Sequence, residues 1–502
     1  MQSNLSLTAI DEISSRIGKD KVFTDKATRL CHRFTHGPEA ILHSDLNDFL
    51  PDAVVRPTCT EEVQEIVRVA DKYEVPLVPQ GGLTGSYGAE GMRGTIAVDM
   101  TCMDKIIEFD ERNHWITAEA GVRIQQIVDF LDEKGYLYYD NPTLAAISTL
   151  GSRVAINGYT VYENRWGSSQ HVILGIEAVL PNGDVVQLGR GSSKPVKSAL
   201  GYNLLDLFIG SKGTLGIITK VTEKFGEKFG KEIYGVKPFK STREGLEAFI
   251  DLKKPLNSSF LWRTRGAPPK YLSRTVPALL GVKWPQEIKM LTDYHLVGEQ
   301  YIVERMEEHV AEIMKRHNML EEIEVPSIGF LGRMQGRVNE YMSISSVGSE
   351  RIKSGGMGYR MITLDPNIPD GSLVKFHGSL EEILEEIEDG DHYPALAETM
   401  NVTCDGAVLP VSGGSTKVWV VVNVNWKKFD EGCRSEFKDW FRKYARLILL
   451  HGGSITATHG FIPRELEAEL VKRELGEKEY ELMKIVKRAI DPKNIMNPKV
   501  RF

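Results

Sequence analysis

The sequence predicts an α+β protein, and three observations indicate this class. Residues 52–82 alternate a β-branched run, an amphipathic stretch and a second β-branched run, which indicates one strand–helix–strand crossover. Residues 172–189 hold two strand-like runs joined by Pro-Asn-Gly-Asp, a hairpin turn signal. Beyond residue 230, long charged helices and isolated strands replace this pattern. A crossover, antiparallel hairpins and separate helices together are typical of α+β folds.

The expected elements follow in chain order. The chain begins with a polar amphipathic helix within residues 1–20. In the crossover, Thr60 is expected to cap the helix, with Glu61 and Glu62 in its first turn. Further strands are expected at 95–100, 115–121, 172–189, 214–225 and 417–426, and charged helices at 297–324 and 465–491.

Composition narrows the class of protein. A chain of 502 residues is long enough for two or three domains. A net charge of −7 argues against a general nucleic-acid or membrane-surface binder, and no apolar run approaches the ~20 residues of a spanning helix. The start of the chain lacks the form of a secretory signal.

The cysteines are scattered, and none forms a C-x-x-C pair. This argues against an iron–sulfur cluster or a structural zinc site in this chain and fits a reducing compartment, so we expect a cytoplasmic location. The five cysteines are Cys31, Cys59, Cys102, Cys404 and Cys433.

The stretch from Val75 to Met100 is dense in glycine and is flanked by strand-like runs. It is not a Walker loop, because no lysine follows Gly85, and it lacks the G-x-G-x-x-G spacing of a Rossmann fingerprint. What remains is a loop whose backbone amides, exposed at Gly81, Gly82 and Gly85, can face an anion. The hydroxyls of Thr84 and Ser86 add further donors.

This stretch resembles the pyrophosphate loop of the FAD-binding PCMH-type flavoproteins, the vanillyl-alcohol oxidase family. Residues 148–189, 201–222, 451–461 and 489–502 resemble further segments of that family, in the same order. The resemblance implies non-covalently bound FAD, since no position clearly matches the family's covalent flavin attachments. The residues that it places at the FAD are Pro79, Gly81, Gly82, Leu83, Thr84, Gly85, Ser86, Ser148, Thr149, Gly151, Asn157, Gly210, Gly213, Gly216, Ile217, Ile218 and Asn497.

The resemblance also implies how the chain divides. Residues 1–50 form an N-terminal helical segment, and 51–230 form the two-subdomain PCMH-type FAD-binding domain. Residues 231–449 form an α+β cap that binds substrate, and 450–502 return to the FAD domain. We also expect a homo-oligomer.

The most similar branch contains the glycolate and D-lactate dehydrogenases and alkyl-dihydroxyacetonephosphate synthase. His459 stands where the hydroxy-acid enzymes carry the histidine of a Glu-His-Gly motif, so the resemblance makes it the catalytic base. His171 is expected to contact FAD or to pack, and His451 to be structural.

The chain departs from that branch at the metal site. Val411, Val418 and Thr458 stand where the family has two histidines and a glutamate that hold a divalent metal. Valine cannot coordinate a cation, so we predict no metal.

An anionic substrate would then need arginine, for which the cap offers Arg333, Arg337 and Arg360, with Arg263 and Arg265 as further options. A phenolic substrate would instead need aromatic partners such as Tyr202, Tyr341, Tyr359 and Trp426.

The expected function is an FAD-dependent oxidoreductase acting on the CH–OH group of a small alcohol or 2-hydroxy acid. Because the chain lacks cluster cysteines, the electrons must pass to an external acceptor, either an iron–sulfur subunit, an electron-transferring flavoprotein or a quinone. Three alternatives stay open: an alkyl-dihydroxyacetonephosphate-synthase-like transferase, an oxidase or hydroxylase of phenols, and a non-catalytic subunit that relays electrons through FAD.

Overall fold

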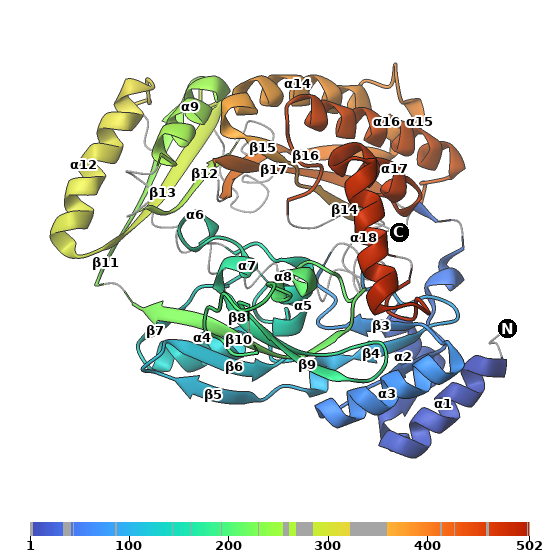
Figure 1. Ribbon diagram of the computed structural model, residues 1–502. Coiled ribbons are helices and arrows are strands. Elements are labelled where there is room, and N and C mark those ends of the chain that lie inside the picture. Colours follow the sequence, from blue (N-terminus) through green and yellow to red (C-terminus); the bar gives the residue numbers. More distant parts are fainter. Residues whose placement is uncertain are drawn as a thin grey trace. The chain divides into compact units, whose positions relative to one another are not determined.

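The computed structural model describes most of the chain (Figure 1). The described residues are 4–33, 42–43, 45–85, 88–142, 144–160, 162–191, 193–228, 230–254, 261–267, 285–321, 359–411, 414–425, 427–457, 461–498 and 500. They form two compact units. Unit 1 comprises Met1–Thr160, Ser169–Glu227 and Ile462–Phe502, and unit 2 comprises Val161–Ser168 and Lys228–Phe461.

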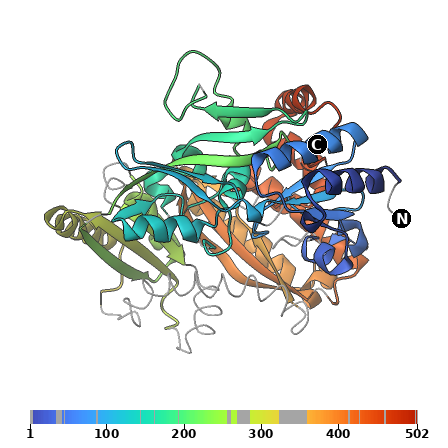
Figure 2. The ribbon, with the colours of Figure 1, turned by 90° about the horizontal axis from the view of Figure 1, so that it is seen from below.

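The first sheet of unit 1 contains the predicted crossover. Its four strands run in the order β1-β2-β4-β3, with β2, β4 and β3 parallel. Helices α1 and α3 pack together beside it (Figures 1 and 2). The elements are α1 (Asn4–Ile17), η1 (Lys19–Lys21), β1 (Val22–Phe23), α2 (Lys26–Cys31), η3 (Leu46–Phe49), β2 (Ala53–Val55), α3 (Thr60–Tyr73), β3 (Leu77–Gln80), β4 (Ile96–Asp99) and η4 (Met100–Cys102).

The second sheet of unit 1 is antiparallel, in the order β5-β6-β10-β8-β9, with β7 paired to β10. The predicted hairpin is confirmed, because the Leu180 amide donates to the Asp184 carbonyl between β8 and β9. The elements are β5 (Ile106–Asp110), β6 (Trp115–Glu119), α4 (Ile124–Glu133), β7 (Tyr136–Tyr138), α5 (Leu150–Ile156), α7 (Ser169–Val172), β8 (Ile173–Val179), β9 (Val185–Gly189), α8 (Leu205–Phe208) and β10 (Ile217–Glu227).

The end of the chain returns to unit 1 through α17 (Arg464–Leu475) and α18 (Glu477–Ile490). The sequence predicted one helix here, which is wrong. Gly476 has a φ of 86°, a left-handed value that ends α17 and begins a new helix. After α18, Ile495 and Met496 join the core of the first sheet, and the Leu77 amide of β3 donates to the Ile495 carbonyl.

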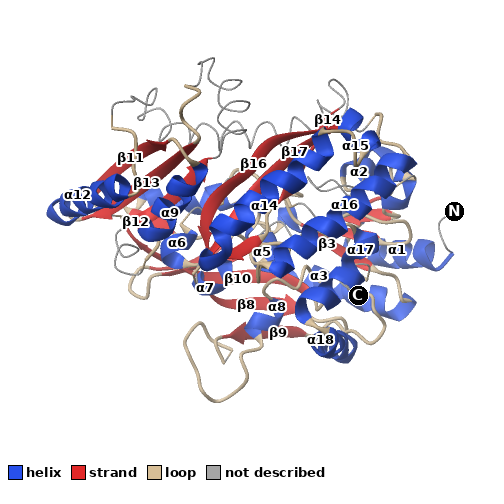
Figure 3. Ribbon diagram, turned by 90° about the horizontal axis from the view of Figure 1, so that it is seen from above, coloured by secondary structure: helices blue, strands red, loops and turns tan. Residues whose placement is uncertain are grey.

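Unit 2 is a single antiparallel sheet in the order β11-β13-β12-β16-β17-β14, with β15 paired to β17. Its main helices lie on one face of this sheet (Figures 1 and 3). The elements are α6 (Glu163–Trp166), β11 (Lys231–Phe239), α9 (Thr242–Leu252), β12 (Leu261–Ala267), β13 (Met290–Gly298), α12 (Gln300–Arg316), β14 (Tyr359–Leu364), β15 (Asn367–Pro369), α14 (Asp370–Glu388), α15 (Pro394–Thr399), β16 (Met400–Val411), β17 (Ser415–Asn425) and α16 (Glu431–Leu450). Both units mix helix and sheet, which confirms the α+β class.

One local prediction in the crossover is wrong. Thr60 is the first residue of α3 and not its cap, because Cys59 occupies the capping position. The Thr60 hydroxyl instead donates a 2.7 Å hydrogen bond to the Glu177 carboxylate of β8. A tertiary partner therefore replaces the local backbone bond that the sequence pattern favours.

Candidate FAD site

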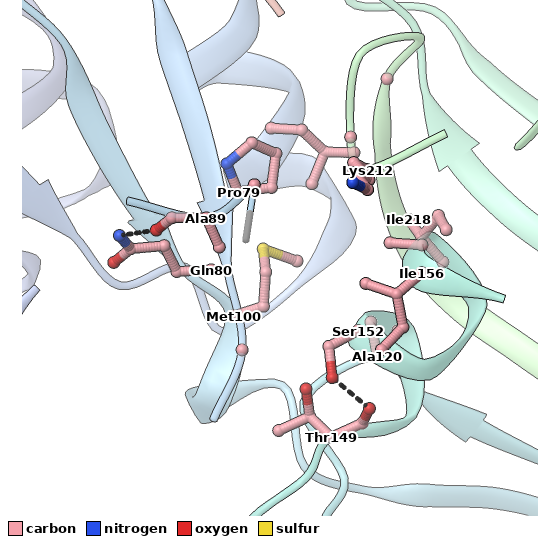
Figure 4. Close-up of a pocket in the computed structure, with 17 residues that line it drawn as sticks. Pro79, Gln80, Ala89, Met100, Ala120, Thr149, Ser152, Ile156, Lys212 and Ile218 are labelled. Atoms are coloured by element: carbon pink, nitrogen blue, oxygen red, sulfur yellow. Dashed lines mark hydrogen bonds between the residues drawn. The ribbon is translucent and has the colours of Figure 1, made fainter. Parts of the chain in front are cut away.

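A pocket in unit 1 lies where the glycine-rich segments meet (Figure 4). It holds about 600 Å³ of empty space, which includes open solvent at its mouth, and most of its lining is backbone or small apolar side chains. It is lined by Pro79, Gln80, Gly81, Gly88, Ala89, Met100, Ala120, Thr149, Gly151, Ser152, Ala155, Ile156, Lys212, Gly213, Gly216, Ile217 and Ile218.

The first glycines of the loop allow two stretches of chain to approach closely. A Cβ on Gly81 would lie 3.1 Å from the Ser152 Cβ, and one on Gly82 would lie 2.9 Å from the Ile147 carbonyl carbon. A Cβ on Gly85 would meet nothing within 4 Å. None of these three glycines has a positive φ, and the left-handed residue of the loop is Leu83, with a φ of 54°. Gly81 and Gly82 therefore seat the loop against the start of α5.

Three more glycines narrow the pocket at its other walls. A Cβ on Gly151 would lie 2.6 Å from the Ala120 Cβ, and one on Gly216 would lie 2.7 Å from the Val179 carbonyl oxygen. Gly213 has a φ of 71°, and its Cβ would lie 3.1 Å from Pro79. Side chains at these three positions would push the walls apart, so the slot can stay narrow only if each position is glycine.

The hydroxyl groups around this slot differ in their partners. Thr84 Oγ1 and Ser148 Oγ lie 3.0 Å apart, and the Ser152 hydroxyl donates to the Thr149 carbonyl at 2.7 Å. The Thr149 hydroxyl is buried in the pocket wall and has no hydrogen-bond partner in the protein. An unpaired buried hydroxyl is unfavourable unless a ligand satisfies it. The glycine-lined slot and this hydroxyl fit a bound dinucleotide.

Two predicted cofactor residues bond to the protein itself. Asn497 donates from its amide nitrogen to the carbonyls of Gly88, at 2.6 Å, and Lys212, at 2.7 Å, so it ties two pocket walls together. Asn157 caps the C-terminal end of α5 with a φ of 49°, and its amide donates to Gln170 at 3.0 Å.

The predicted residues divide into two groups by position. The lining includes Pro79, Gly81, Thr149, Gly151, Gly213, Gly216, Ile217 and Ile218. Eight further predicted residues are described but are not among the lining residues: Gly82, Leu83, Thr84, Gly85, Ser148, Asn157, Gly210 and Asn497. Ser86 is outside the described residues.

Sequence reasoning missed about half of the lining. The missed residues are Gln80, Gly88, Ala89, Met100, Ala120, Ser152, Ala155, Ile156 and Lys212. Gly88 and Lys212 stand within the glycine segments and could have been included, whereas Met100 and Ala120 follow strands β4 and β6 and carry no local signal.

A buried polar network lies behind α5 in unit 1. Arg153 of α5 pairs with Asp140, whose carboxylate also accepts a 2.8 Å hydrogen bond from Ser169. Tyr138 donates to the Glu223 carboxylate. Burial, together with the negative charge of Asp140, raises the pKa of Glu223 to about 8. Glu223 is therefore expected to keep its proton at neutral pH.

Most of the predicted catalytic and substrate-binding residues lie outside the part of the chain that the structure describes. His459, Arg333 and Arg337 lie outside the described residues, as do Thr458, Tyr341 and Trp426. Arg360 lies in β14, where its register partner is Val424 of β17. Arg263 and Arg265 lie in β12, and Tyr359 begins β14.

The other candidate residues from the sequence lie within the part of the chain that the structure describes. Val411 ends β16, and Val418 of β17 is fully buried opposite Val408. His451 follows α16 and meets Phe376 edge-to-face, with ring centroids 5.6 Å apart. His171 is exposed on α7, and Tyr202 is 91% exposed.

Two features are absent from the described residues. No helix there is both long and apolar enough to cross a bilayer. In the same part of the chain, His, Cys, Asp and Glu side chains form no group of three or more that could hold a metal ion.

The slot is built from backbone and small side chains on five separated stretches of chain, which is the kind of site that an extended dinucleotide needs. Comparisons with known proteins identify the dinucleotide. Residues 51–189 match the family model described as an FAD binding domain, and residues 420–500 match that of the C-terminal domain of FAD linked oxidases.

Similar proteins cover almost the whole chain. D-2-hydroxyglutarate dehydrogenase of Stutzerimonas stutzeri is 28% identical over 97% of each chain. Glycolate oxidase subunit GlcD of Bacillus subtilis is 25% identical over 90% of this chain and 89% of its own. The solved structure of p-cresol methylhydroxylase with substrate bound shares the fold, with a TM-score of 0.76 at 17% identity, covering 99% of this chain and 97% of that one.

The chain contains an FAD binding domain and the C-terminal domain of the FAD linked oxidases, and it shares its fold with p-cresol methylhydroxylase. It is an FAD-dependent oxidoreductase, and the predictions of its family and its cofactor are confirmed.

Proposed function

We propose that the protein oxidises a small 2-hydroxy acid at its CH–OH group, with the FAD seated in the unit 1 pocket. The observation that carries this proposal is the similarity to D-2-hydroxyglutarate dehydrogenase over 97% of both chains. The relatives named glycolate oxidase subunit GlcD and D-lactate dehydrogenase support the same substrate class.

The chain's own groups at the cofactor are those of the glycine-lined slot. Gly81 and Gly82 hold the loop 81–85 against α5, so that the amides of the loop can face the diphosphate. The buried Thr149 hydroxyl can donate to the same ligand. Gly213, Gly216, Ile217 and Ile218 form another wall of the slot. Bound FAD supplies a hydride acceptor at the flavin N5 atom.

We assign the proton transfer to His459. In the oxidation, the carbon of the CH–OH group loses a hydride and its hydroxyl oxygen loses a proton to the imidazole. A histidine suits this role, because its usual pKa lies near neutral pH. Arg333, Arg337 and Arg360 are proposed to bind the substrate carboxylate, since Val411, Val418 and Thr458 offer no metal ligand set.

The two electrons must leave the flavin after each turnover. We propose that a partner protein accepts them, either an iron–sulfur subunit or an electron-transferring flavoprotein, because no cysteine pair suited to a cluster occurs in the sequence. The homo-oligomer, the cytoplasmic location and the division into FAD-binding and cap domains stay predictions.

The test is anaerobic reduction of the flavin by a substrate panel. D-lactate, glycolate and D-2-hydroxyglutarate should bleach the flavin absorbance, and treatment with EDTA should leave the rate unchanged. Bleaching only by para-substituted phenols, or adduct formation only with an acylated dihydroxyacetone phosphate, would replace the proposal. If only a partner protein reduces the flavin, the chain is an electron relay.

The role of His459 has a separate test. His459→Ala should slow substrate-driven flavin reduction by about 10²–10⁴-fold, the usual contribution of a general base. His451→Ala is the matched control, because His451 stands at the end of α16 and packs on Phe376. A His459→Ala rate within threefold of the parent enzyme would show that another group takes the proton.

A further inference from the structure

We propose that Lys212 supplies the positive charge that neutralises the FAD diphosphate. Lys212 carries the one ionisable side chain among the residues that line the described pocket (Figure 4). The glycine loop itself contains no lysine or arginine between Pro79 and Gly88. The fold brings a cation to this neutral loop from a segment about 120 residues later in the chain. The inference depends on the FAD cofactor, and not on the identity of the substrate.

The backbone of Lys212 is held at both ends in an unusual conformation. Its φ is 55°, in the left-handed region where a residue with a side chain is strained. Its amide donates to the Ala155 carbonyl of α5 at 2.7 Å, and its carbonyl accepts from the Asn497 amide at 2.7 Å. These two bonds fix the direction in which the Lys212 side chain leaves the backbone.

The aliphatic stem of Lys212 follows Gly88 along the pocket wall. A Cβ on Gly88 would lie 3.0 Å from the Lys212 Cδ, 3.5 Å from its Cβ and 3.6 Å from its Cγ. Gly88 has a φ of 100°, so this position suits glycine for conformational reasons as well. The absence of a side chain at Gly88 leaves room for the lysine stem inside the pocket.

The charge balance makes this lysine important. The two phosphates of FAD are anionic, and burying an anion is unfavourable unless donors and an opposite charge compensate it. The amides of the glycine loop provide donors but no net charge, and Lys212 provides the charge. A hydrogen bond to a charged group contributes enough that its loss should weaken FAD binding by about 10- to 100-fold.

The experiment measures ligand binding to FAD-free protein by calorimetry, with FAD and with riboflavin, which has no phosphate. Lys212→Met should bind FAD about 10- to 100-fold more weakly and bind riboflavin within twofold of the parent protein. Its FAD affinity should also depend less on salt, since screening acts on the lost charge. Lys212→Arg keeps the charge and should stay within about threefold. Lys105→Met, at an exposed lysine outside the pocket, should match the parent.

Several results would overturn the proposal. FAD binding by Lys212→Met within threefold of the parent would show that the charge is not needed. Equal weakening of riboflavin would indicate a packing role, and a changed flavin midpoint potential with unchanged FAD affinity would place the cation at the ring. If Lys212→Met fails to fold, Lys212→Gln and the salt dependence of the parent give the same decision. No substrate is involved, so a failure of the hydroxy-acid proposal leaves this result intact.

Discussion

Gly82→Ala tests whether packing against the rest of the protein, and not the bound FAD, fixes the conformation of the glycine loop. The new methyl group would lie 2.9 Å from the Ile147 carbonyl carbon, and closer still to the carbonyl oxygen. This neighbour is backbone, so no side-chain rotation can relieve the overlap. The segment is held by hydrogen bonds from the Ser148 amide to Leu144 and from the Leu150 amide to Val122, both at 2.9 Å.

The expected destabilisation follows from these contacts. Overpacking a fitted site costs about 1–3 kcal/mol, and a strained or broken backbone hydrogen bond adds about 1 kcal/mol. Gly82→Ala should therefore destabilise this region of the FAD-free protein by about 2–4 kcal/mol. Gly85→Ala is the matched control, because its Cβ would meet no atom within 4 Å and its φ is not positive. It should change the stability of the FAD-free protein by less than about 1 kcal/mol.

The assay is hydrogen–deuterium exchange of the FAD-free protein, read in peptides that cover residues 77–85 and 144–156. Gly82→Ala should speed exchange there by about 30-fold or more, and Gly85→Ala should not. FAD titration of both variants completes the comparison. The methyl group of Gly85→Ala would face open space in the FAD-free protein, so it can affect only a bound ligand. Unchanged exchange in Gly82→Ala would refute the close-packing argument. Equal effects of the two substitutions would refute the loop geometry.

Three other substitutions test the pocket and its support. Burial raises the pKa of Glu223 to about 8, so the folded state keeps a proton that the unfolded state loses above about 4.5, and stability should fall as pH rises between these values. Glu223→Gln should remove this loss, so that thermal unfolding at pH 9 approaches that at pH 6; a parent protein equally stable at both would contradict the argument. Thr149→Val removes the buried unpaired hydroxyl and should leave the free energy of unfolding of the FAD-free protein within about 0.5 kcal/mol of the parent value. The same substitution should weaken FAD binding, measured by calorimetry, about 5- to 10-fold. An unchanged FAD affinity would mean that the hydroxyl does not reach the cofactor. Lys487→Met loses 2.7 Å hydrogen bonds to the Thr214 and Met496 carbonyls and should lower the unfolding temperature by several degrees. Lys478→Met, at an exposed lysine of the same helix, is the control and should leave that temperature unchanged. Equal unfolding temperatures for the two variants would show that the buried lysine does not hold the C-terminal segment.

Much of the local structure was predictable because its signals are local. The hairpin at 181–184, the crossover and the helix at the start of the chain depend on turn chemistry and hydrophobic period, and the structure confirms them. The prediction failed where a residue's hydrogen bond goes to a partner that is distant in the sequence. Thr60 has the pattern of a helix cap but bonds to Glu177 on a strand more than a hundred residues away.

The sequence by itself determined the α+β class, the family and the FAD cofactor, because glycine segments in a characteristic order can be recognised without knowing what they touch. Only the tertiary structure decided which residues share the pocket. Ala120 and Lys212 line it because strand pairing and the C-terminal return bring their segments beside Pro79. For the same reason, the sequence could not show why each glycine is needed. Gly82 makes room for Ile147 and Gly88 makes room for Lys212, and neither neighbour is close in sequence.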